Sequence, residues 1–107
     1  MKWNLDFHPK ARVEYNALDG SPKKQVSKAI DKVLQNPLSK FEGGYGNSLG
    51  NKASSKLAGC LGIKLKKTGL RVVYRLIREG GVMNIIVISI RDDDEVYKEA
   101  ERRLYEE

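Results

Sequence analysis

The sequence predicts a small α+β domain in which helices cover an antiparallel sheet. Two helical periodicities follow a short alternating segment near the N-terminus, and three strand-like segments separated by glycine-containing turns occupy residues 61–90. The length of 107 residues and the 40% hydrophobic content suffice for one hydrophobic core. We therefore expect a single domain over residues 1–107, with the element order β-α-α-β-β-β-α and the two N-terminal helices packed on one face of an antiparallel meander.

A change of period marks the first strand and the first helix. Trp3, Leu5 and Phe7 alternate with polar residues, as in a strand with one buried face. A helix then begins at Pro9, because proline suits the first helical turn, and it ends at Asp19-Gly20. The apolar stripe of this helix consists of Ala11, Tyr15 and Leu18.

The second helix has the clearest pattern in the chain. Ser21 is a good N-cap and Pro22 a good first helical residue, and Asn36-Pro37 ends the helix because proline disfavours a helical conformation in the preceding residue. Its apolar stripe consists of Val26, Ala29, Ile30, Val33 and Leu34. Residues 39–56 follow with four glycines, four serines and no consistent period. We expect a loop there, with Gly43-Gly44-Tyr45-Gly46 as a flexible stretch, and the whole segment is either a mobile functional loop or one that a partner orders.

Three strands and a last helix complete the predicted fold. Segment 61–66 alternates, with its apolar residues on one face, and segment 70–78 has one apolar face and one mixed face. Segment 82–90 is almost continuously apolar, as expected of a central strand covered on both faces. Residues 92–95 are all acidic and supply an N-cap and first-turn carboxylates for a helix. The apolar stripe of that helix consists of Val96, Ala100 and Leu104.

The charges are divided unevenly along the chain. Residues 1–91 carry 17 Lys and Arg against 6 Asp and Glu, whereas residues 92–107 carry 3 against 8. The larger part therefore has a balance of +11, which attracts polyanions such as RNA or DNA because each phosphate contact releases counterions. An ordinary solvated basic surface is the alternative interpretation.

Several kinds of site are excluded because the chain lacks the residues that they need. The only cysteine is Cys60 and the only histidine is His8, so one chain forms no disulfide, no zinc site of cysteines and histidines, and no catalytic histidine pair. The acidic residues 92–95 are explained as helix capping, so we expect no metal and no cofactor. No signal peptide and no membrane-spanning run is present, which predicts a cytoplasmic protein.

One set of basic residues remains for chemistry, together with a tyrosine. Period two predicts that Lys64 and Lys66 share a face, and the following turn brings Arg71 alongside them. Like charges placed together repel, so the arrangement points to an anion between them, namely a phosphate. A solvent-facing basic face is again the alternative. The full set of candidates is Lys64, Lys66, Arg71, Arg75, Arg91 and Tyr97.

These residues carry a resemblance to a known family. The segments IKLKKTGLRVVY at 63–74, VISIR at 87–91 and EVYKEAERRL at 95–104, together with LDF at 5–7, resemble the RelE toxins of bacterial toxin–antitoxin modules, within the RelE/ParE superfamily. The resemblance implies a ribosome-dependent endoribonuclease that cuts mRNA in the A site and inhibits translation. It also implies a cognate acidic antitoxin, a heteromeric toxin–antitoxin complex, and the ribosome and mRNA as partners.

The resemblance assigns roles to four residues. Lys64 matches a lysine of the catalytic face, Arg71 an arginine that steadies phosphate, Arg91 an arginine proposed as general acid, and Tyr97 a tyrosine that orients or stacks on RNA. For Arg91, phosphate stabilisation is the chemically better role, because arginine is a poor proton donor. Further RNA contacts are expected from Lys66, Lys67 and Arg75.

Two positions depart from the family pattern. Gly62 stands where the family has a lysine that is a general-base candidate, and Asp93 stands where another basic residue is common. The general base is therefore open, with Lys64 and Lys66 as the available substitutes. Two alternative functions follow: a ParE-like toxin that inhibits DNA gyrase, and a catalytically degenerate module that binds RNA or an antitoxin without cutting. The joint presence of Lys64, Arg71, Arg91 and Tyr97 argues against the gyrase inhibitor.

Overall fold

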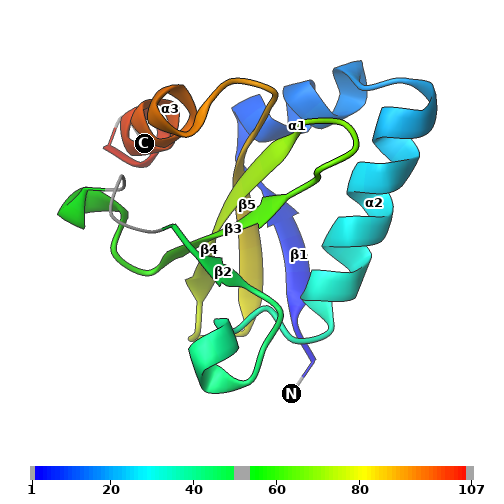
Figure 1. Ribbon diagram of the computed structural model, residues 1–107. Coiled ribbons are helices and arrows are strands. Elements are labelled where there is room, and N and C mark those ends of the chain that lie inside the picture. Colours follow the sequence, from blue (N-terminus) through cyan, green and yellow to red (C-terminus); the bar gives the residue numbers. More distant parts are fainter. Residues whose placement is uncertain (1, 50–53, 106–107) are drawn as a thin grey trace.

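The computed structural model describes residues 2–49 and 54–105, and a five-stranded sheet runs through its middle (Figure 1). The strands are β1 (Asn4–Phe7), β2 (Asn47–Ser48), β3 (Cys60–Lys64), β4 (Arg71–Ile77) and β5 (Val82–Ser89), in the spatial order β1-β5-β4-β3-β2. The helices are α1 (Pro9–Ala17), α2 (Gly20–Leu34) and α3 (Asp93–Tyr105), with short 3₁₀ turns at Lys40–Glu42 and Ser55–Leu57.

The predicted meander of β3, β4 and β5 is confirmed, and the sheet as a whole is mixed because β1 pairs in parallel with β5. The ladder between β4 and β5 shifts register at one point. Val73 pairs with Val87 and Tyr74 with Ile85, which leaves Ile86 as the extra residue of a β-bulge. Strand β5 lies in the interior of the sheet and is buried along most of its length, as its continuous apolar sequence predicts.

The sheet has a hydrophobic core on each face. As predicted, α1 and α2 cover one face, with Ala11, Val26 and Ile30 packed against the sheet. Helix α3 covers the opposite face through Val96 and Ala100 (Figure 1). Successive side chains of β4 point to opposite faces of the sheet and therefore enter the two cores in turn.

The N-terminal elements differ from the prediction in two details. The strand begins at Asn4, one residue after Trp3, and Leu5 is 37% exposed because β1 is an edge strand. The expected N-cap, Ser21, is wrong: α2 begins at Gly20, whose φ of +59° allows the tight turn from α1. The Ser21 hydroxyl instead accepts a hydrogen bond from the Gln25 side chain at 3.1 Å.

The segment predicted as a structureless loop is ordered over its described residues. The 3₁₀ turns and β2 lie in it, and a bridge pairs Ser39 with Gly46. Gly44 and Gly46 allow close packing, because a Cβ on Gly44 would come within 2.1 Å of the Leu38 carbonyl oxygen and one on Gly46 within 2.2 Å of the Tyr74 hydroxyl. That buried hydroxyl donates to the Pro37 carbonyl at 2.8 Å. Residues 50–53 of the predicted loop lie outside the described residues.

The start of α3 follows the sequence prediction. The Asp92 carboxylate accepts a hydrogen bond from the Glu95 backbone amide at 3.0 Å, which is a capping contact. His8 plays the same part for α1, since its Nδ1 accepts from the Lys10 amide at 3.1 Å. Within the described residues, none of the helices has both the length and the apolar character that crossing a membrane requires.

Candidate functional site

The meander brings the first two candidate residues directly side by side. Lys64 is the last residue of β3 and Arg71 the first of β4, and the two are register partners. Their side chains lie on the α3 face of the sheet, and α3 begins above them. The register therefore confirms that the turn at residues 67–69 places Arg71 alongside Lys64.

The anion between these cations is a protein carboxylate. Asp93, the first residue of α3, accepts from Arg71 Nε at 2.7 Å through one oxygen and from Lys64 Nζ at 3.2 Å through the other. The expectation that residues 92–95 serve only as helix caps is therefore wrong for Asp93. The prediction that an anion lies between Lys64 and Arg71 is confirmed, with Asp93 as that anion, and a phosphate bound at the same cations stays a prediction.

The electrostatics of Asp93 reflect its two partners. Its side chain is 15% exposed, and burial alone would raise its pKa. The hydrogen bonds and charges of Lys64 and Arg71 outweigh that effect and hold the pKa of the carboxyl below its usual value. The cluster of Lys64, Arg71 and Asp93, which we call the Asp93 cluster, therefore carries one net positive charge near neutral pH.

Arg71 also ties the β5–α3 connection to the sheet. Its Nη1 donates to the Arg91 carbonyl at 2.8 Å and more weakly to the Gly69 carbonyl at 3.4 Å. Its Nη2 makes no hydrogen bond within the described part of the chain, and two of the three donors of the Lys64 ammonium are likewise not used there. The Asp93 cluster thus keeps donors that can bind an oxyanion.

Tyr97 lies beside the Asp93 cluster in a buried position. Its hydroxyl donates to the Leu49 carbonyl at 3.0 Å, and burial, reinforced by the Asp93 charge, raises the pKa of the phenol against the smaller effect of Arg71. In this conformation the ring packs in the core under α3 rather than presenting a face for stacking.

The Leu49 side chain packs beside Gly62, which has no side chain of its own. A Cβ on Gly62 would approach the Leu49 side chain to 3.1 Å, so Leu49 fills the space beside this glycine. Both residues line a small hollow with Lys64, Arg71 and Tyr97. The segment before residue 50 therefore forms one wall of the candidate site.

The three residues expected to contact RNA are spread more widely. Lys66 and Lys67 are exposed in the turn between β3 and β4, and Lys66 lines a hollow of about 250 Å³ together with Lys64 and Arg71. Arg75 shares the α3 face but lies toward the other end of β4, where its Nε donates to Asn84 at 3.0 Å. Lys66 therefore lies next to the Asp93 cluster, Lys67 follows it in the turn, and Arg75 does not join the cluster.

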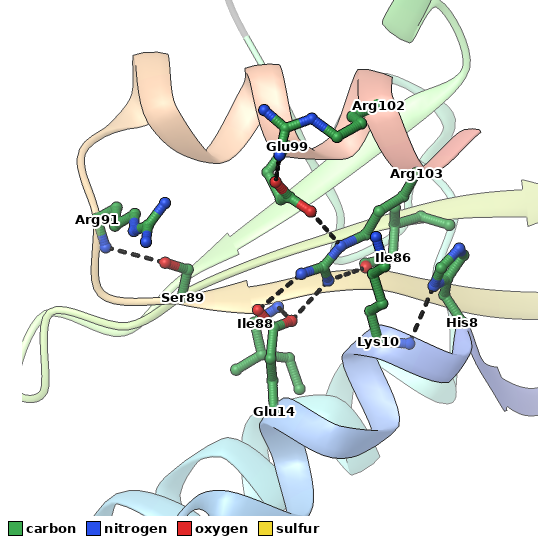
Figure 2. Close-up of polar contacts among 10 residues, drawn as sticks. All are labelled: His8, Lys10, Glu14, Ile86, Ile88, Ser89, Arg91, Glu99, Arg102 and Arg103. Carbon is green, nitrogen blue, oxygen red and sulfur yellow. Dashed lines mark hydrogen bonds and ion pairs between the residues drawn. The ribbon is translucent and has the colours of Figure 1, made fainter. Parts of the chain in front are cut away.

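Arg91 contributes its backbone to the cluster while its side chain faces another space. It follows β5 and lines a hollow of about 490 Å³ between α1 and α3, which Leu70 and Val96 also border. Figure 2 shows its side chain beside Ser89, whose hydroxyl accepts from the Arg91 amide at 3.1 Å. The structure therefore groups Lys64, Arg71 and Tyr97 around one hollow and leaves the Arg91 guanidinium at the rim of a neighbouring one.

A second arginine–carboxylate cluster lies near the C-terminal end of α3, and sequence reasoning missed it. Arg103 is 6% exposed and reaches across β5 to Glu14 of α1, with contacts of 2.7 and 2.9 Å (Figure 2). It also bonds Glu99 at 2.8 Å and the carbonyl of the bulge residue Ile86 at 2.8 Å. Glu14 in turn accepts from the Ile88 amide at 3.1 Å. This Arg103 cluster ties both helices to the bulge in β5.

Signals for the missed residues existed in the sequence. Arg103 follows Val96 and Ala100 at helical spacing and so belongs to the buried stripe of α3, where an arginine needs carboxylate partners. Glu14 is 89 residues away from it and carried no local signal. Asp93 could have been recognised as a counter-ion, because a face with several cations requires one.

The chemistry open to the Asp93 cluster is that of an oxyanion site with an adjacent carboxylate. Guanidinium and ammonium groups bind phosphate oxygens, and a carboxylate can accept a proton. The described residues contain no group of three or more His, Cys, Asp or Glu side chains that could hold a metal ion.

Comparisons with known proteins identify similar chains. No family model matches the sequence. The chain is 33% identical over 107 residues to the mRNA interferase toxin RelE of Escherichia coli and to the mRNA interferase RelE of Shigella flexneri, covering 97% of this chain and 99% of each relative.

Two similar solved structures are of Escherichia coli RelE. A free-state mutant with two arginines replaced by alanine superposes with a TM-score of 0.74 and 29% identity, covering 97% of this chain and 99% of that chain. The toxin in the intact RelBE toxin–antitoxin complex matches with a TM-score of 0.67 and 26% identity, covering 84% and 98% respectively. Both fold and sequence therefore point to the same set of proteins.

Proposed function

The chain belongs to the RelE family of toxins from toxin–antitoxin modules, and from this premise we propose that it is a ribosome-dependent mRNA endoribonuclease. It cuts mRNA in the ribosomal A site and thereby inhibits translation in the cytoplasm. The observation that carries the proposal is the Asp93 cluster, in which Lys64 and Arg71 are register partners with unused donors at the partly exposed ends of β3 and β4.

The proposed reaction needs no metal because RNA carries its own nucleophile. The ribose 2′-hydroxyl attacks the adjacent phosphorus, so the protein has only to hold the phosphate, remove one proton and supply another. Lys64 and Arg71 bind the scissile phosphate and stabilise the charge that develops on it. Lys66 and Lys67 contact neighbouring phosphates, and Arg91 approaches from the rim of the adjacent hollow.

The dependence on the ribosome follows from what the site lacks. A half-exposed pair of cations binds phosphate but does not impose the in-line geometry that the 2′-oxygen attack requires. The ribosome holds the A-site codon in a defined shape and supplies that geometry. The role of Tyr97 is to hold Leu49 in place. The two residues form one wall of the hollow beside the Asp93 cluster.

A translation reaction assembled from purified components tests the proposal. The chain is added to bacterial ribosomes stalled on a defined mRNA, and primer extension maps new 5′ ends. We expect cuts within the A-site codon that require both the ribosome and the chain. Rapid cutting of the same mRNA without ribosomes, or intact mRNA with them, contradicts the proposal. A supercoiling assay with DNA gyrase tests the ParE-like alternative, and we expect no inhibition.

An acidic antitoxin is the proposed binding partner. The similarity to the Escherichia coli RelBE complex supports this, as does the balance of +11 over residues 1–91. The antitoxin inactivates the enzyme by displacing α3 or by covering the basic residues of β3 and β4. Hydrogen exchange should therefore change most in residues 64–75 or 92–105 when the partner binds. Changes confined to β1, α1 and α2 contradict this mode of inhibition.

A module that binds RNA without cutting is a second candidate, and two observations favour it. Asp93 neutralises part of the phosphate-binding charge, and Gly62 supplies no lysine. Such a module would bind programmed ribosomes with an affinity that falls steeply with salt and would leave the mRNA intact. The primer-extension measurement separates the two candidates.

A further inference from the structure

We propose that Asp93 is the general base that activates the 2′-hydroxyl in this enzyme. The inference rests on the proposed function. It assigns the role of general base, for which the family has a candidate lysine at the position that Gly62 occupies here. Its basis is the geometry of the Asp93 cluster, in which a carboxylate lies within hydrogen-bond distance of both cations that bind the phosphate.

The first step of the argument concerns space for the phosphate. Asp93 occupies Arg71 Nε and one Lys64 donor, while Arg71 Nη2 and the remaining ammonium donors are not used by the described residues. A phosphate can therefore bind beside the carboxylate without displacing it. The 2′-oxygen is separated from the phosphorus by only three intervening atoms, so a base in contact with both phosphate-binding groups is within reach of the 2′-hydroxyl.

The second step compares Asp93 with the other candidate bases. Lys64 donates to Asp93, and an ammonium group, in Lys66 as in Lys64, has three donors and no acceptor. The Tyr97 hydroxyl is buried and donates to Leu49, and His8 caps α1 through its Nδ1. The hydrogen bonds and charges of Lys64 and Arg71 lower the pKa of Asp93, which keeps the carboxyl deprotonated and able to accept a proton but makes it a weaker base before substrate binds. The negative charge of a phosphate bound beside the carboxylate raises the pKa of Asp93 and so makes it a better proton acceptor.

The third step balances the reaction. Asp93 takes the proton of the 2′-hydroxyl, a bond forms between the 2′-oxygen and phosphorus, and the bond from phosphorus to the 5′-oxygen breaks. Lys64 gives a proton to the departing 5′-oxygen, so the products are a 2′,3′-cyclic phosphate and a 5′-hydroxyl. The neutral Lys64 amine then recovers the proton from Asp93 across their 3.2 Å contact, which restores both groups.

The experiment measures single-turnover cleavage on programmed ribosomes for wild type and for Asp93→Asn. Binding is measured separately, with an mRNA that carries a 2′-deoxy nucleotide at the cut position. We expect Asp93→Asn to cut about 10²- to 10⁴-fold more slowly, as loss of a general base does. Its binding should be equal or tighter, because a negative charge has been removed beside the phosphate. Asp94→Asn is the matched control, since it removes an exposed carboxylate from the same helical turn, and it should cut at the wild-type rate.

Two further variants distinguish a base from a structural residue. Asp93→Glu should recover part of the rate. Asp93→His should give a rate that rises through the range in which a histidine loses its proton, whereas wild type should be flat there. The charged and titratable groups that act on position 93 are Lys64 on β3, Arg71 on β4 and Tyr97 on α3, and all three are unchanged in these variants.

The outcomes separate this inference from the proposed function. If wild type does not cut, the proposed function fails. If wild type cuts and Asp93→Asn cuts equally fast or faster, Asp93 is a counter-ion that restrains the site, and the inference is overturned. If Asp93→Asn is slow only because binding or folding is lost, measured by the 2′-deoxy mRNA and by thermal unfolding, the inference is overturned as well.

Discussion

The two ends of α3 carry two arginine–carboxylate clusters that differ in burial and in the use of their donors. In the Arg103 cluster the guanidinium is 6% exposed and bonds Glu14, Glu99 and a backbone carbonyl. In the Asp93 cluster the Arg71 side chain is 30% exposed and one of its terminal nitrogens makes no hydrogen bond to the described residues. The first cluster is closed, and the second is open on one side.

This difference indicates that the Arg103 cluster stabilises the fold and that the Asp93 cluster can bind a ligand. A buried charge requires hydrogen-bond partners, and each nitrogen of the Arg103 guanidinium already bonds a carboxylate or a carbonyl of the protein. The half-exposed Asp93 cluster keeps donors that the described residues do not use and that a phosphate can bind. Helix α3 is therefore anchored through its C-terminal half, and its N-terminal turn is held over the site.

The largest effect on folding should come from Arg103→Met. The substitution leaves the carboxylates of Glu14 and Glu99 without their cation in a partly buried setting, which typically costs about 3–5 kcal/mol. Urea unfolding measures the free energy. A loss below about 1 kcal/mol would show that the buried cluster does not anchor α3.

Acidification should weaken the closed cluster as well. Burial acts to raise the pKa of Glu99, but hydrogen bonds and charge from Arg103, with smaller contributions from Arg102 and Lys10, lower it overall. A carboxyl with a lowered folded-state pKa contributes stability above its ordinary pKa and loses it as the pH falls through the folded-state value. The free energy of unfolding should therefore decline below about pH 4. Arg103→Met should flatten this decline, and an unchanged pH dependence in that variant contradicts the assignment.

A smaller effect is expected from Tyr97→Phe. The ring stays in the core, while the hydrogen bond to the Leu49 carbonyl is lost, which should cost about 1 kcal/mol. Thermal unfolding measures the loss, and hydrogen exchange near Leu49 should increase. Tyr15→Phe is the control, because its hydroxyl bonds the part-buried Ser27 side chain far from the site. If exchange near Leu49 is unchanged, Tyr97 does not hold this wall.

The sequence predicted most of the fold because the signals were local. The alternation of residues 61–66 and 70–78, the apolar run of 82–90 and the stripe of α2 each indicate an element without knowledge of its neighbours. The adjacency of Lys64 and Arg71 was also predictable, since a tight turn fixes the register of the two strands that it joins.

The remaining features depend on residues far apart in the chain. The pairing of Asp93 with Lys64 spans 29 residues, and the contact between Glu14 and Arg103 spans 89. The order within residues 39–49 arises from the close approach of Gly46 to Tyr74, and composition alone indicated only flexibility. Glycines that permit close packing and glycines that permit motion have the same sequence signature.

The most direct test of the open cluster as the cleavage site is the single-turnover cleavage rate of Arg71→Ala on programmed ribosomes. The account predicts a rate about 10²–10³-fold below wild type, with a loss of unfolding free energy of only about 1–2 kcal/mol from its bonds to Asp93 and Arg91. Arg78→Ala, which removes an exposed arginine paired with Glu42, should cut at the wild-type rate. Wild-type cleavage by folded Arg71→Ala would contradict the account.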